Sequence, residues 1–534
     1  MDLPVVIVGA GPTGLMLALE LGAIGLQPIV LERRTDPTRE SRATNIHART
    51  TELLDMRGLL DELAVDAPTR STWPYGGLDT ELDLAGLDTT HPYVLFTPQS
   101  RTEAVLAARL SERGVAIRRG HELRSMDAGP ERVLVNVDSP DGGYQIVASY
   151  LIGCDGGRSR VREAAGIGFP RTPEIRITAL ADVVLPPQTV LPTNTRPGVR
   201  ILPLPDGVTR VVFADPDRTD LTPATPVTRE EIAAALQRGA GVPLGDAPVL
   251  WTSRFGNSTA LADRYRAGRV LLAGDAAHIH PPAGGQGMGV GIQDAVNLGW
   301  KLGLVAQGQA SPALLDSYEA ERRPVGAALC RDCLVQVLLV DLGRDPGLAP
   351  AGPALRAVLA EMLEVNATNQ DRARSVSGLS VGYRPARGAG EPPAHPLLGQ
   401  RIRDLQLRPS GGRTTRLYEQ LRRPEFVLLE LDGQELNGQE PDVQEPEGLG
   451  LDGLGLDDEL LTRLRADGRL RTVVATLAEP YPPLTGVRAL LLRPDGHVAW
   501  VRTGTANEPG LAAALRSVLA GPSAPTARPA VPVR

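Results

Sequence analysis

The sequence predicts a protein of the α/β class that begins with a strand–helix–strand unit. Val5 to Val8 is a short, continuous apolar run, which is typical of a strand buried in a parallel sheet. Residues with a helical period follow from Gly14 to Ile24, and a second strand is predicted from Gln27 to Leu31. Two parallel strands joined by a helix form one βαβ unit. The N-terminal region is therefore expected to be a parallel sheet covered by helices.

Length and composition set the scale of the protein. At 534 residues the chain exceeds one ordinary hydrophobic core, so two or three domains are expected. The net charge of −7 is spread along the chain, whereas nucleic-acid-binding surfaces need concentrated positive charge, so nucleic acid is not an expected partner. No apolar run reaches the roughly 20 residues that span a membrane. No signal peptide is expected either, which predicts a cytoplasmic protein without a membrane partner.

The strand pattern changes after the first unit. Val133–Val137 and Gln145–Ile152 alternate and indicate a β-meander. From about residue 171 to 263, only Arg229–Arg238 has the pattern of a clear helix, and Pro and Gly separate several strand-like runs. This pattern predicts a mainly antiparallel sheet. The strand-like runs are Ile175–Val184, Val199–Leu204 and Thr209–Ala214.

A third region is predicted at the C-terminal end. The Pro- and Gly-rich stretch from Arg384 to Leu397 is typical of a linker. The strands predicted beyond it are Phe426–Leu431, Thr472–Ala475, Ala489–Leu492 and Val498–Arg502. An acidic stretch from Gly433 to Asp458 interrupts them, and residues 521–534 are expected to form a flexible tail. The region between linker and tail is therefore a small α/β domain.

The segment Gly9–Gly14 (GAGPTG) lies between the first strand and the first helix, where a dinucleotide-binding fingerprint belongs. Gly9 allows the tight turn, Gly11 lets the backbone approach a pyrophosphate, and Gly14 lets helix and strand pack closely. The phosphates then meet the unpaired N–H groups at the helix N-terminus. Glu32, at the end of the second strand, is placed to accept hydrogen bonds from a ribose.

Two further motifs place an aspartate and glycines after a predicted strand. The first runs from Ile152 to Arg162 and contains Asp155, and the second runs from Arg269 to His278 and contains Asp275. Each aspartate alone could be a turn or N-cap residue. The segment Pro281–Gly289 follows the second motif and opens a loop of backbone N–H groups leading into a helix. Such a loop suits the carbonyl edge of a flavin ring, which needs donors when the ring is reduced and anionic.

In this order and separation, the three motifs resemble those of the flavoprotein monooxygenases of the p-hydroxybenzoate hydroxylase type (group A). More closely, the chain resembles the bacterial aromatic-polyketide oxygenases. The shared elements are Glu32-Arg33, Ser41–Ala43, Arg49–Glu52, Gln99 ahead of a helix, Gly299–Leu302 and Asp316–Pro324. The resemblance is strong over residues 3–345. The Arg493–Trp500 stretch resembles the thioredoxin-like C-terminal domain of the same subgroup.

The resemblance implies non-covalently bound FAD, NAD(P)H as co-substrate and O2. Asp155 matches a residue implicated in both FAD and NAD(P)H binding, and Asp275 matches the residue on the ribityl chain. Arg42 matches an arginine near the pyrophosphate and nicotinamide nucleotide, Gln99 a glutamine beside the flavin, and Leu123 a position whose backbone touches adenine. The full set predicted to bind the cofactor is Gly9, Gly11, Thr13, Gly14, Glu32, Arg33, Arg42, Gln99, Leu123, Asp155, Asp275, Pro282, Gly285, Gly287, Met288 and Gly289.

One residue departs from the family pattern. The family often has Asn after Gly287-Met288, where this chain has Gly289. A contact made by the backbone N–H would survive this change, and a side-chain contact would be lost.

The resemblance also implies a fold class and domain limits. The class is α/β, or α+β overall, with a Rossmann-type FAD-binding domain, an antiparallel-sheet substrate domain and a small thioredoxin-like C-terminal domain. The expected limits are 1–170 and 265–390 for the discontinuous FAD-binding domain, 171–264 with parts of 70–100 for the substrate domain, and 395–520 for the C-terminal domain. All three cysteines precede residue 334, so the C-terminal domain has no dithiol. Its expected role is packing or formation of a homodimer.

Arg49 is the one candidate catalytic residue. In the resembling family an arginine here lies near the flavin and substrate, where a permanently charged donor could stabilise a negative oxygen. The alternative is a structural ion pair with Glu52. His278 and His280 flank the flavin loop and are expected to make supporting hydrogen bonds, whereas His47 is given no role. Cys330 and Cys333 are expected to be buried helix residues, and no metal site is predicted.

The function that follows is an FAD- and NAD(P)H-dependent monooxygenase that acts on a polycyclic aromatic polyketide. The resemblance implies that a flavin C4a-(hydro)peroxide hydroxylates the substrate, and the antiparallel sheet is expected to form one wall of the cavity. Baeyer–Villiger oxygenation of a ketone by the same cofactor stays open. A flavin-dependent dehydrogenase without oxygen insertion and a flavin-binding scaffold without turnover are alternatives of other classes.

Overall fold

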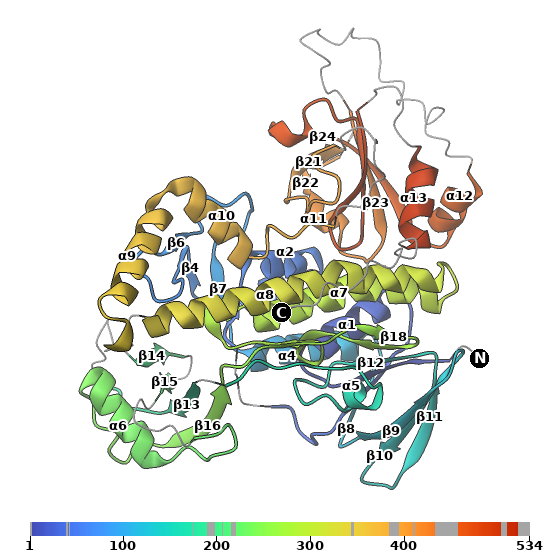
Figure 1. The fold of residues 1–534 in the computed structure, drawn as a ribbon. Helices are drawn as coiled ribbons and strands as arrows, with labels where there is room; N and C mark the ends of the chain where they lie inside the picture. Colours follow the sequence, from blue (N-terminus) through green and yellow to red (C-terminus); the bar gives the residue numbers. More distant parts are fainter. Residues whose placement is uncertain are drawn as a thin grey trace.

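Figure 1 shows the computed structural model, in which the C-terminal domain lies on one side of two long helices and most of the sheets lie on the other. The structure describes residues 3–38, 41, 43–174, 176–189, 198–204, 207–214, 221–342, 346–383, 395–409, 412–432, 458–503 and 510–521. Among these residues no helix combines the length and the hydropathy needed to cross a membrane.

The N-terminal region forms a six-stranded sheet in the order β18-β19-β12-β1-β2-β8. The five strands from β19 to β8 run parallel, and β18 pairs antiparallel with β19 at one edge. The βαβ unit that the sequence predicts is therefore confirmed. The strands are β1 (Val5–Val8), β2 (Ile29–Glu32), β8 (Ile117–Arg119), β12 (Tyr150–Gly153), β18 (Arg266–Ala267) and β19 (Val270–Leu272).

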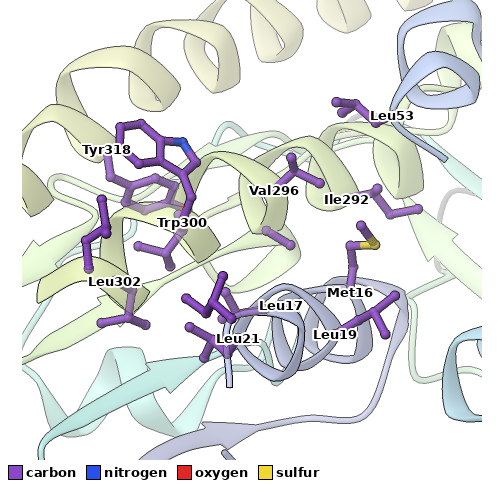
Figure 2. Close-up of a cluster of buried hydrophobic side chains, with 14 of the residues drawn as sticks. Met16, Leu17, Leu19, Leu21, Leu53, Ile292, Val296, Trp300, Leu302 and Tyr318 are labelled. Carbon is purple, nitrogen blue, oxygen red and sulfur yellow. The ribbon is translucent and has the colours of Figure 1, made fainter. Parts of the chain in front are cut away.

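Helix α1 (Pro12–Ala23) packs against this sheet, and helix α7 (Gly287–Ala306) packs against α1. Figure 2 shows the apolar side chains between them, with Met16, Leu17 and Leu21 facing Ile292, Val296 and Trp300. The two helices lie close because α7 carries glycines at the contact, and a Cβ at Gly303 would lie 1.7 Å from Ile24 Cδ1. The Ser311 hydroxyl caps a 3-10 turn at Pro312–Leu315, and the chain continues from it as α8 (Asp316–Leu342).

The predicted meander is confirmed only in part. Strands β9 (Glu122–Ala128), β10 (Val133–Asp138) and β11 (Tyr144–Ala148) form a separate antiparallel sheet. The run Gln145–Ile152, predicted as one strand, divides at Ser149 between β11 and β12. It divides because Tyr150 to Gly153 are buried on both faces between β1 and β19, which is the environment of a central parallel strand.

The antiparallel sheet predicted for the middle of the chain is confirmed, with the strand order β14-β15-β13-β16. Its strands are β13 (Ile177–Val183), β14 (Val199–Pro203), β15 (Thr209–Phe213) and β16 (Val249–Gly256), and β16 was not predicted. Helix α6 (Arg229–Ala240) begins with a capping box in which Thr228 and Glu231 exchange hydrogen bonds. Its apolar side chains pack on one face of the sheet. Figure 1 shows α6 on the outer side, so the opposite face is turned toward the rest of the molecule.

The C-terminal domain contains a second six-stranded sheet, in the order β22-β21-β24-β23-β25-β26. Only β23 and β24 run parallel; the other pairs are antiparallel. The strands are β21 (Gln406–Pro409), β22 (Thr415–Arg416), β23 (Phe426–Leu431), β24 (Leu470–Leu477), β25 (Ala489–Leu492) and β26 (Val498–Arg502), and the helices are α11 (Leu417–Gln420), α12 (Glu459–Ala466) and α13 (Leu511–Ala520). Most of the predicted linker, the acidic stretch and the tail lies outside the described residues.

Further helices and short strands complete the molecule, and some of them pack around the end of the long helix α8. A second apolar cluster joins the end of α8 to α9, α10 and the small strands between residues 69 and 96. These elements are α2 (Ala48–Met56), α3 (Leu60–Ala64), α4 (Gln99–Glu112), α5 (Arg160–Ala164), α9 (Ala351–Glu364), α10 (Asn366–Val376), β3 (Asn45–Ile46), β4 (Thr69–Arg70), β5 (Thr72–Trp73), β6 (Leu82–Asp83), β7 (Val94–Phe96), β17 (Ala260–Leu261) and β20 (His278–Ile279).

Candidate functional site

The glycines of the first motif meet three different needs. Gly9 has φ of +106°, and a Cβ there would lie 2.3 Å from the Cys154 carbonyl oxygen, so only glycine fits. A Cβ at Gly14 would lie 2.0 Å from the Gly9 carbonyl oxygen, which explains the close packing of helix and strand. Gly11 is different, because nothing lies within 4 Å of its Cβ position. The backbone at Gly11 therefore borders open space at the N-terminus of α1.

Glu32 and Thr13 hold the turn from either side. Glu32 Oε2 accepts a hydrogen bond from the backbone N–H of Ala10 at 2.9 Å, inside the glycine motif. Its Oε1 accepts one from the N–H of Arg34 at 2.9 Å. Thr13 packs against the third motif, since a Cβ at Gly274 would lie 2.6 Å from Thr13 Oγ1. Arg33 is exposed at the same end of the sheet.

Asp155 combines a capping role with a free oxygen. Its Oδ2 accepts hydrogen bonds from the N–H groups of Arg160 at 2.7 Å and Val161 at 3.2 Å, at the start of α5. Its Oδ1 is buried and has no hydrogen-bond partner among the described residues. Burial raises the pKa of this carboxyl group above its ordinary value, although Ser159 and the backbone donors oppose the shift. Beside it, the Leu123 carbonyl accepts a hydrogen bond from Arg160 Nη1 at 3.3 Å.

The turn that carries Asp275 is fixed from behind by a buried carboxylate on α7. Asp294 Oδ2 accepts hydrogen bonds from the Gly274 N–H at 3.1 Å and from His278 Nε2 at 2.8 Å. The supporting role predicted for His278 is therefore confirmed. Asp275 itself is exposed, so its carboxylate is available to a ligand.

The loop predicted to meet the flavin ring is held by two side chains that the sequence did not indicate. The Gly284 carbonyl accepts hydrogen bonds from His47 Nε2 at 2.8 Å and from Trp73 Nε1 at 3.2 Å. Gly284 and Gly285 have φ of +76° and +67°, which favours glycine. Burial lowers the pKa of His47 to about 4, so its ring is neutral at neutral pH. Pro282 directly precedes this turn.

Helix α7 begins at Gly287, so Gly287, Met288 and Gly289 form its first turn. The first N–H groups of a helix have no partner within the helix, and they carry the positive end of its dipole. A Cβ at Gly289 would lie 2.7 Å from Thr50 Oγ1. The close packing of α2 against α7 is therefore the physical reason for Gly289, because an asparagine side chain has no space there.

Gln99 begins α4 and is joined to the segment that follows Arg42. The Gln99 N–H donates to the Ala43 carbonyl at 2.9 Å, and Gln99 Oε1 accepts from the Ala43 N–H at 3.4 Å. Gln99 Nε2 donates to Glu103 Oε1 at 2.8 Å. Arg42 lies outside the described residues, so its predicted place near the pyrophosphate stays a prediction.

Arg49 forms the ion pair that the sequence left open as an alternative. Its Nη1 lies 2.8 Å from Glu52 Oε2, and its Nη2 donates to the Asp495 carbonyl of the C-terminal domain at 2.6 Å. Both side chains of the pair are buried. Glu52 is also paired with Arg401 at 2.9 Å. A catalytic role for Arg49 stays a prediction.

The cysteines are placed as the sequence predicts. Cys330 and Cys333 are buried on α8, and both are free thiols, as is Cys154. Burial raises the pKa of Cys330 to about 11 and raises that of Cys154 well above its ordinary value. Thiols of this kind stay protonated and are poor nucleophiles. Among the described residues, no cluster of His, Cys, Asp and Glu could hold a metal ion.

A cavity of about 760 Å³ reaches the flavin loop from the side of α7 and α8. At one end it is lined by His47, Gln286 and Gly289, and it extends to the C-terminal domain. None of its described lining residues belongs to the four-stranded sheet of residues 177–256. The predicted sheet wall therefore does not border this cavity.

The sequence-predicted residues converge on one edge of the main sheet. Strands β1, β2, β12 and β19 are parallel neighbours, and the glycine motif, Glu32, Asp155 and Asp275 lie at or just beyond their carboxyl ends. Open α/β sheets bind ligands at this edge. The open space at Gly11 and the unpartnered oxygen of Asp155 fit a nucleotide with a pyrophosphate and hydroxyl groups. The residues present therefore fit FAD.

Two family models match the chain. The model described as FAD binding domain matches residues 2–332, and the model described as aromatic-ring hydroxylase, C-terminal, matches residues 395–522. The chain is 40% identical over 532 residues to the 12-dehydrotetracycline 5-monooxygenase/anhydrotetracycline 6-monooxygenase of Streptomyces rimosus, covering 97% of this chain and 99% of the relative.

Solved structures agree with these matches. An anhydrotetracycline hydroxylase from Streptomyces rimosus superposes with a TM-score of 0.81 at 40% identity, covering 98% of this chain and 100% of the other. CabE, an aromatic hydroxylase from angucycline biosynthesis, superposes with a TM-score of 0.81 at 37% identity, with the same coverage. The chain therefore belongs to the FAD-dependent aromatic-ring hydroxylases, and it is a flavin monooxygenase that uses NAD(P)H and O2.

Proposed function

We propose that this monooxygenase hydroxylates a polycyclic aromatic polyketide. The observation that carries the proposal is the similarity over nearly the whole chain to an anhydrotetracycline 6-monooxygenase and to an aromatic hydroxylase from angucycline biosynthesis. Both similarities extend over the middle sheet as well as the cofactor domain. In an FAD enzyme the cofactor carries the oxygen chemistry, and the protein supplies binding, orientation and the exclusion of water.

The residues of the three sequence motifs would bind the FAD cofactor. The N–H groups at Gly11 and Thr13 would hold the pyrophosphate, Glu32 would accept a hydrogen bond from the adenosine ribose, and the Leu123 backbone would contact the adenine. The unpartnered Asp155 Oδ1 and the exposed carboxylate of Asp275 would accept hydrogen bonds from hydroxyl groups of the cofactor.

The first turn of α7 and the loop before it act on the flavin ring. The N–H groups of Gly287 to Gly289 would donate to the pyrimidine edge of the ring, where reduction places negative charge. His47 and Trp73 hold the Gly284 carbonyl through hydrogen bonds, so this oxygen is already engaged by protein donors. Gln99 would lie beside the ring, and it is hydrogen-bonded to Ala43, which follows Arg42.

The described part of the middle sheet does not border the cavity of about 760 Å³, and its face opposite α6 is the surface that we propose for contact with the aromatic substrate outside that cavity. On the face opposite α6, Asp182 and Arg210 are cross-strand neighbours joined by two hydrogen bonds of 2.8 and 2.7 Å. The Arg210 guanidinium lies 5.8 Å from the ring centroid of Trp251. Trp251 is the cross-strand neighbour of Asp182 on β16, on the side of β13 away from Arg210. A buried donor–acceptor pair beside an aromatic ring suits a flat substrate that carries oxygen substituents.

Labelled O2 tests the proposal. We expect the purified enzyme, given NAD(P)H and a panel of polycyclic phenols that includes anhydrotetracycline, to place label from O2 in a new hydroxyl group of the organic product. Label in a ring-expanded ester would show Baeyer–Villiger oxygenation instead. Oxidation of the organic compound without incorporated label would show a dehydrogenase and contradict the proposal.

A further inference from the structure

Tyr383 is held by three groups of the C-terminal domain. Its backbone N–H donates to the Gly399 carbonyl at 2.7 Å. Its ring lies 4.2 Å from the His497 ring, centroid to centroid, and the Arg493 guanidinium lies 4.9 Å from its centroid. Arg493 and His497 belong to the hairpin between β25 and β26. The position of the Tyr383 side chain therefore depends on how the C-terminal domain is seated.

The Tyr383 hydroxyl contacts a buried arginine of the FAD-binding domain. Arg322 Nη1 donates to Tyr383 Oη at 2.9 Å, and Arg322 Nε donates to Asp294 Oδ1 at 2.7 Å. Both charged side chains are fully buried. Tyr383 thus supplies one of the partners that keep this guanidinium in place.

Asp294 connects Arg322 to the cofactor turn. Its second oxygen accepts the Gly274 N–H at 3.1 Å and His278 Nε2 at 2.8 Å. Burial alone would raise the pKa of Asp294, but Arg322 and His278 hold it below its ordinary value, so the group stays a carboxylate. Gly274 has φ of +61° and directly precedes Asp275. Any shift of Asp294 therefore moves the backbone that carries Asp275.

We propose that Tyr383 acts through Arg322 and Asp294 to position the Gly274–Asp275 turn, so that retention of FAD depends on the seating of the C-terminal domain. The C-terminal domain thereby gains a role that needs no dithiol. Tyr383, Arg322 and Asp294 are positioning residues, because Asp275 makes the contact to the cofactor. The inference rests on the role proposed above for Asp275.

The test measures the rate at which FAD leaves the diluted holoenzyme, followed by the fluorescence of the free flavin. Tyr383→Phe removes only a hydroxyl group, so the variant keeps its ring contacts. Loss of a hydrogen bond to a charged group is expected to speed FAD release about tenfold. Arg322→Lys keeps a charge near Asp294 but cannot contact both partners, and it is expected to speed release as well.

The matched control is Tyr481→Phe. Tyr481, in the C-terminal domain, is like Tyr383 a partly buried tyrosine, and its hydroxyl donates to Asp88 Oδ2 at 2.8 Å across the domain boundary. Its described polar side-chain contacts are with Asp88 and Arg403 and not with Asp294, so FAD release from this variant is expected to match the wild type. Equal release rates for Tyr383→Phe and Tyr481→Phe would overturn the inference.

A double-mutant cycle tests the route. Asp294→Asn is expected to speed FAD release, and adding Tyr383→Phe to it is expected to change little further, because both act on the same turn. Fully additive effects would show that Tyr383 acts by another path and would overturn the proposal. Asp275→Ala separates the role of Asp275 from the positioning role of Tyr383. Unchanged FAD release from Asp275→Ala contradicts the role of Asp275. Faster release from Asp275→Ala with normal release from Tyr383→Phe contradicts only the positioning by Tyr383, Arg322 and Asp294.

Discussion

Replacement of Gly11 by valine is expected to yield a folded protein that binds no FAD. Gly11 has φ of −76° and ψ of 179°, an extended conformation that any residue adopts, so the backbone is not strained by a side chain. Nothing lies within 4 Å of its Cβ position, so valine meets no protein atom. The side chain would occupy the space that we assign to the pyrophosphate. The absorbance of flavin in the purified protein, together with its melting temperature, provides the measurement.

Gly510→Val is the matched control for this substitution. Gly510 is likewise the N-cap of a helix, α13, with φ of −63° and ψ of 153°, and nothing lies within 4 Å of its Cβ position. This variant is expected to keep its full FAD content. A Gly11→Val protein with normal FAD content would place the pyrophosphate elsewhere, and a loss of flavin in both variants would show a general effect on folding.

Replacement of Arg49 by alanine is expected to lower the melting temperature and leave product formation per bound flavin unchanged. Arg49 is buried, and its guanidinium joins Glu52 to the Asp495 carbonyl of the C-terminal domain. Removing one partner of a buried ion pair costs about 3–5 kcal/mol. Arg401 still pairs with Glu52, so we expect the lower end of this range. Arg49→Lys should restore part of the stability, because an ammonium group cannot reproduce the two-sided contact.

Arg403→Ala serves as the control for Arg49. Arg403 also crosses the domain boundary, where it pairs with Asp88 at 2.8 Å, but the Arg403 side chain is 34% exposed and that of Asp88 is 50% exposed. Exposed pairs contribute little, so its melting temperature is expected to change little. If Arg49 is catalytic, the Arg49→Ala variant gives the opposite result. It then binds FAD and keeps a nearly normal melting temperature, but its turnover falls by about 10²–10³, as when one preorganised donor to a developing charge is lost.

The parts of the site that were predictable lie in continuous stretches of sequence. The glycine motif, Asp155 and Asp275 each follow a strand that its own apolar run predicts. The carboxyl ends of parallel strands lie at the same edge of a sheet, so the three motifs come together. The prediction of one strand over Gln145–Ile152 was wrong because two strands of different sheets follow one another there with only Ser149 between them. No local pattern marks that change of sheet.

The supports of the site depend on residues far apart in the chain. His47 reaches Gly284 over 237 positions, and Trp73 reaches it over 211. The sequence gives no sign that Asp294 supports the site, because its partner Arg322 lies 28 positions further along the chain. Long-range pairs of this kind follow from the tertiary fold, so propensity and spacing do not reveal them. The pairing of Arg49 with Glu52, three positions apart on α2, was foreseeable for the opposite reason.

Denaturation of the purified protein tests most directly whether the assembled site holds FAD as a non-covalent cofactor. Cys330 and Cys333 are buried and Cys154 is half-buried, and burial raises the pKa of all three thiols, which disfavours a covalent link through sulfur. We expect a yellow protein that releases one FAD per chain into the supernatant on acid precipitation, identified by its mass. Chromophore that stays with the precipitate, or a colourless folded protein that takes up no added FAD, would contradict the site described here.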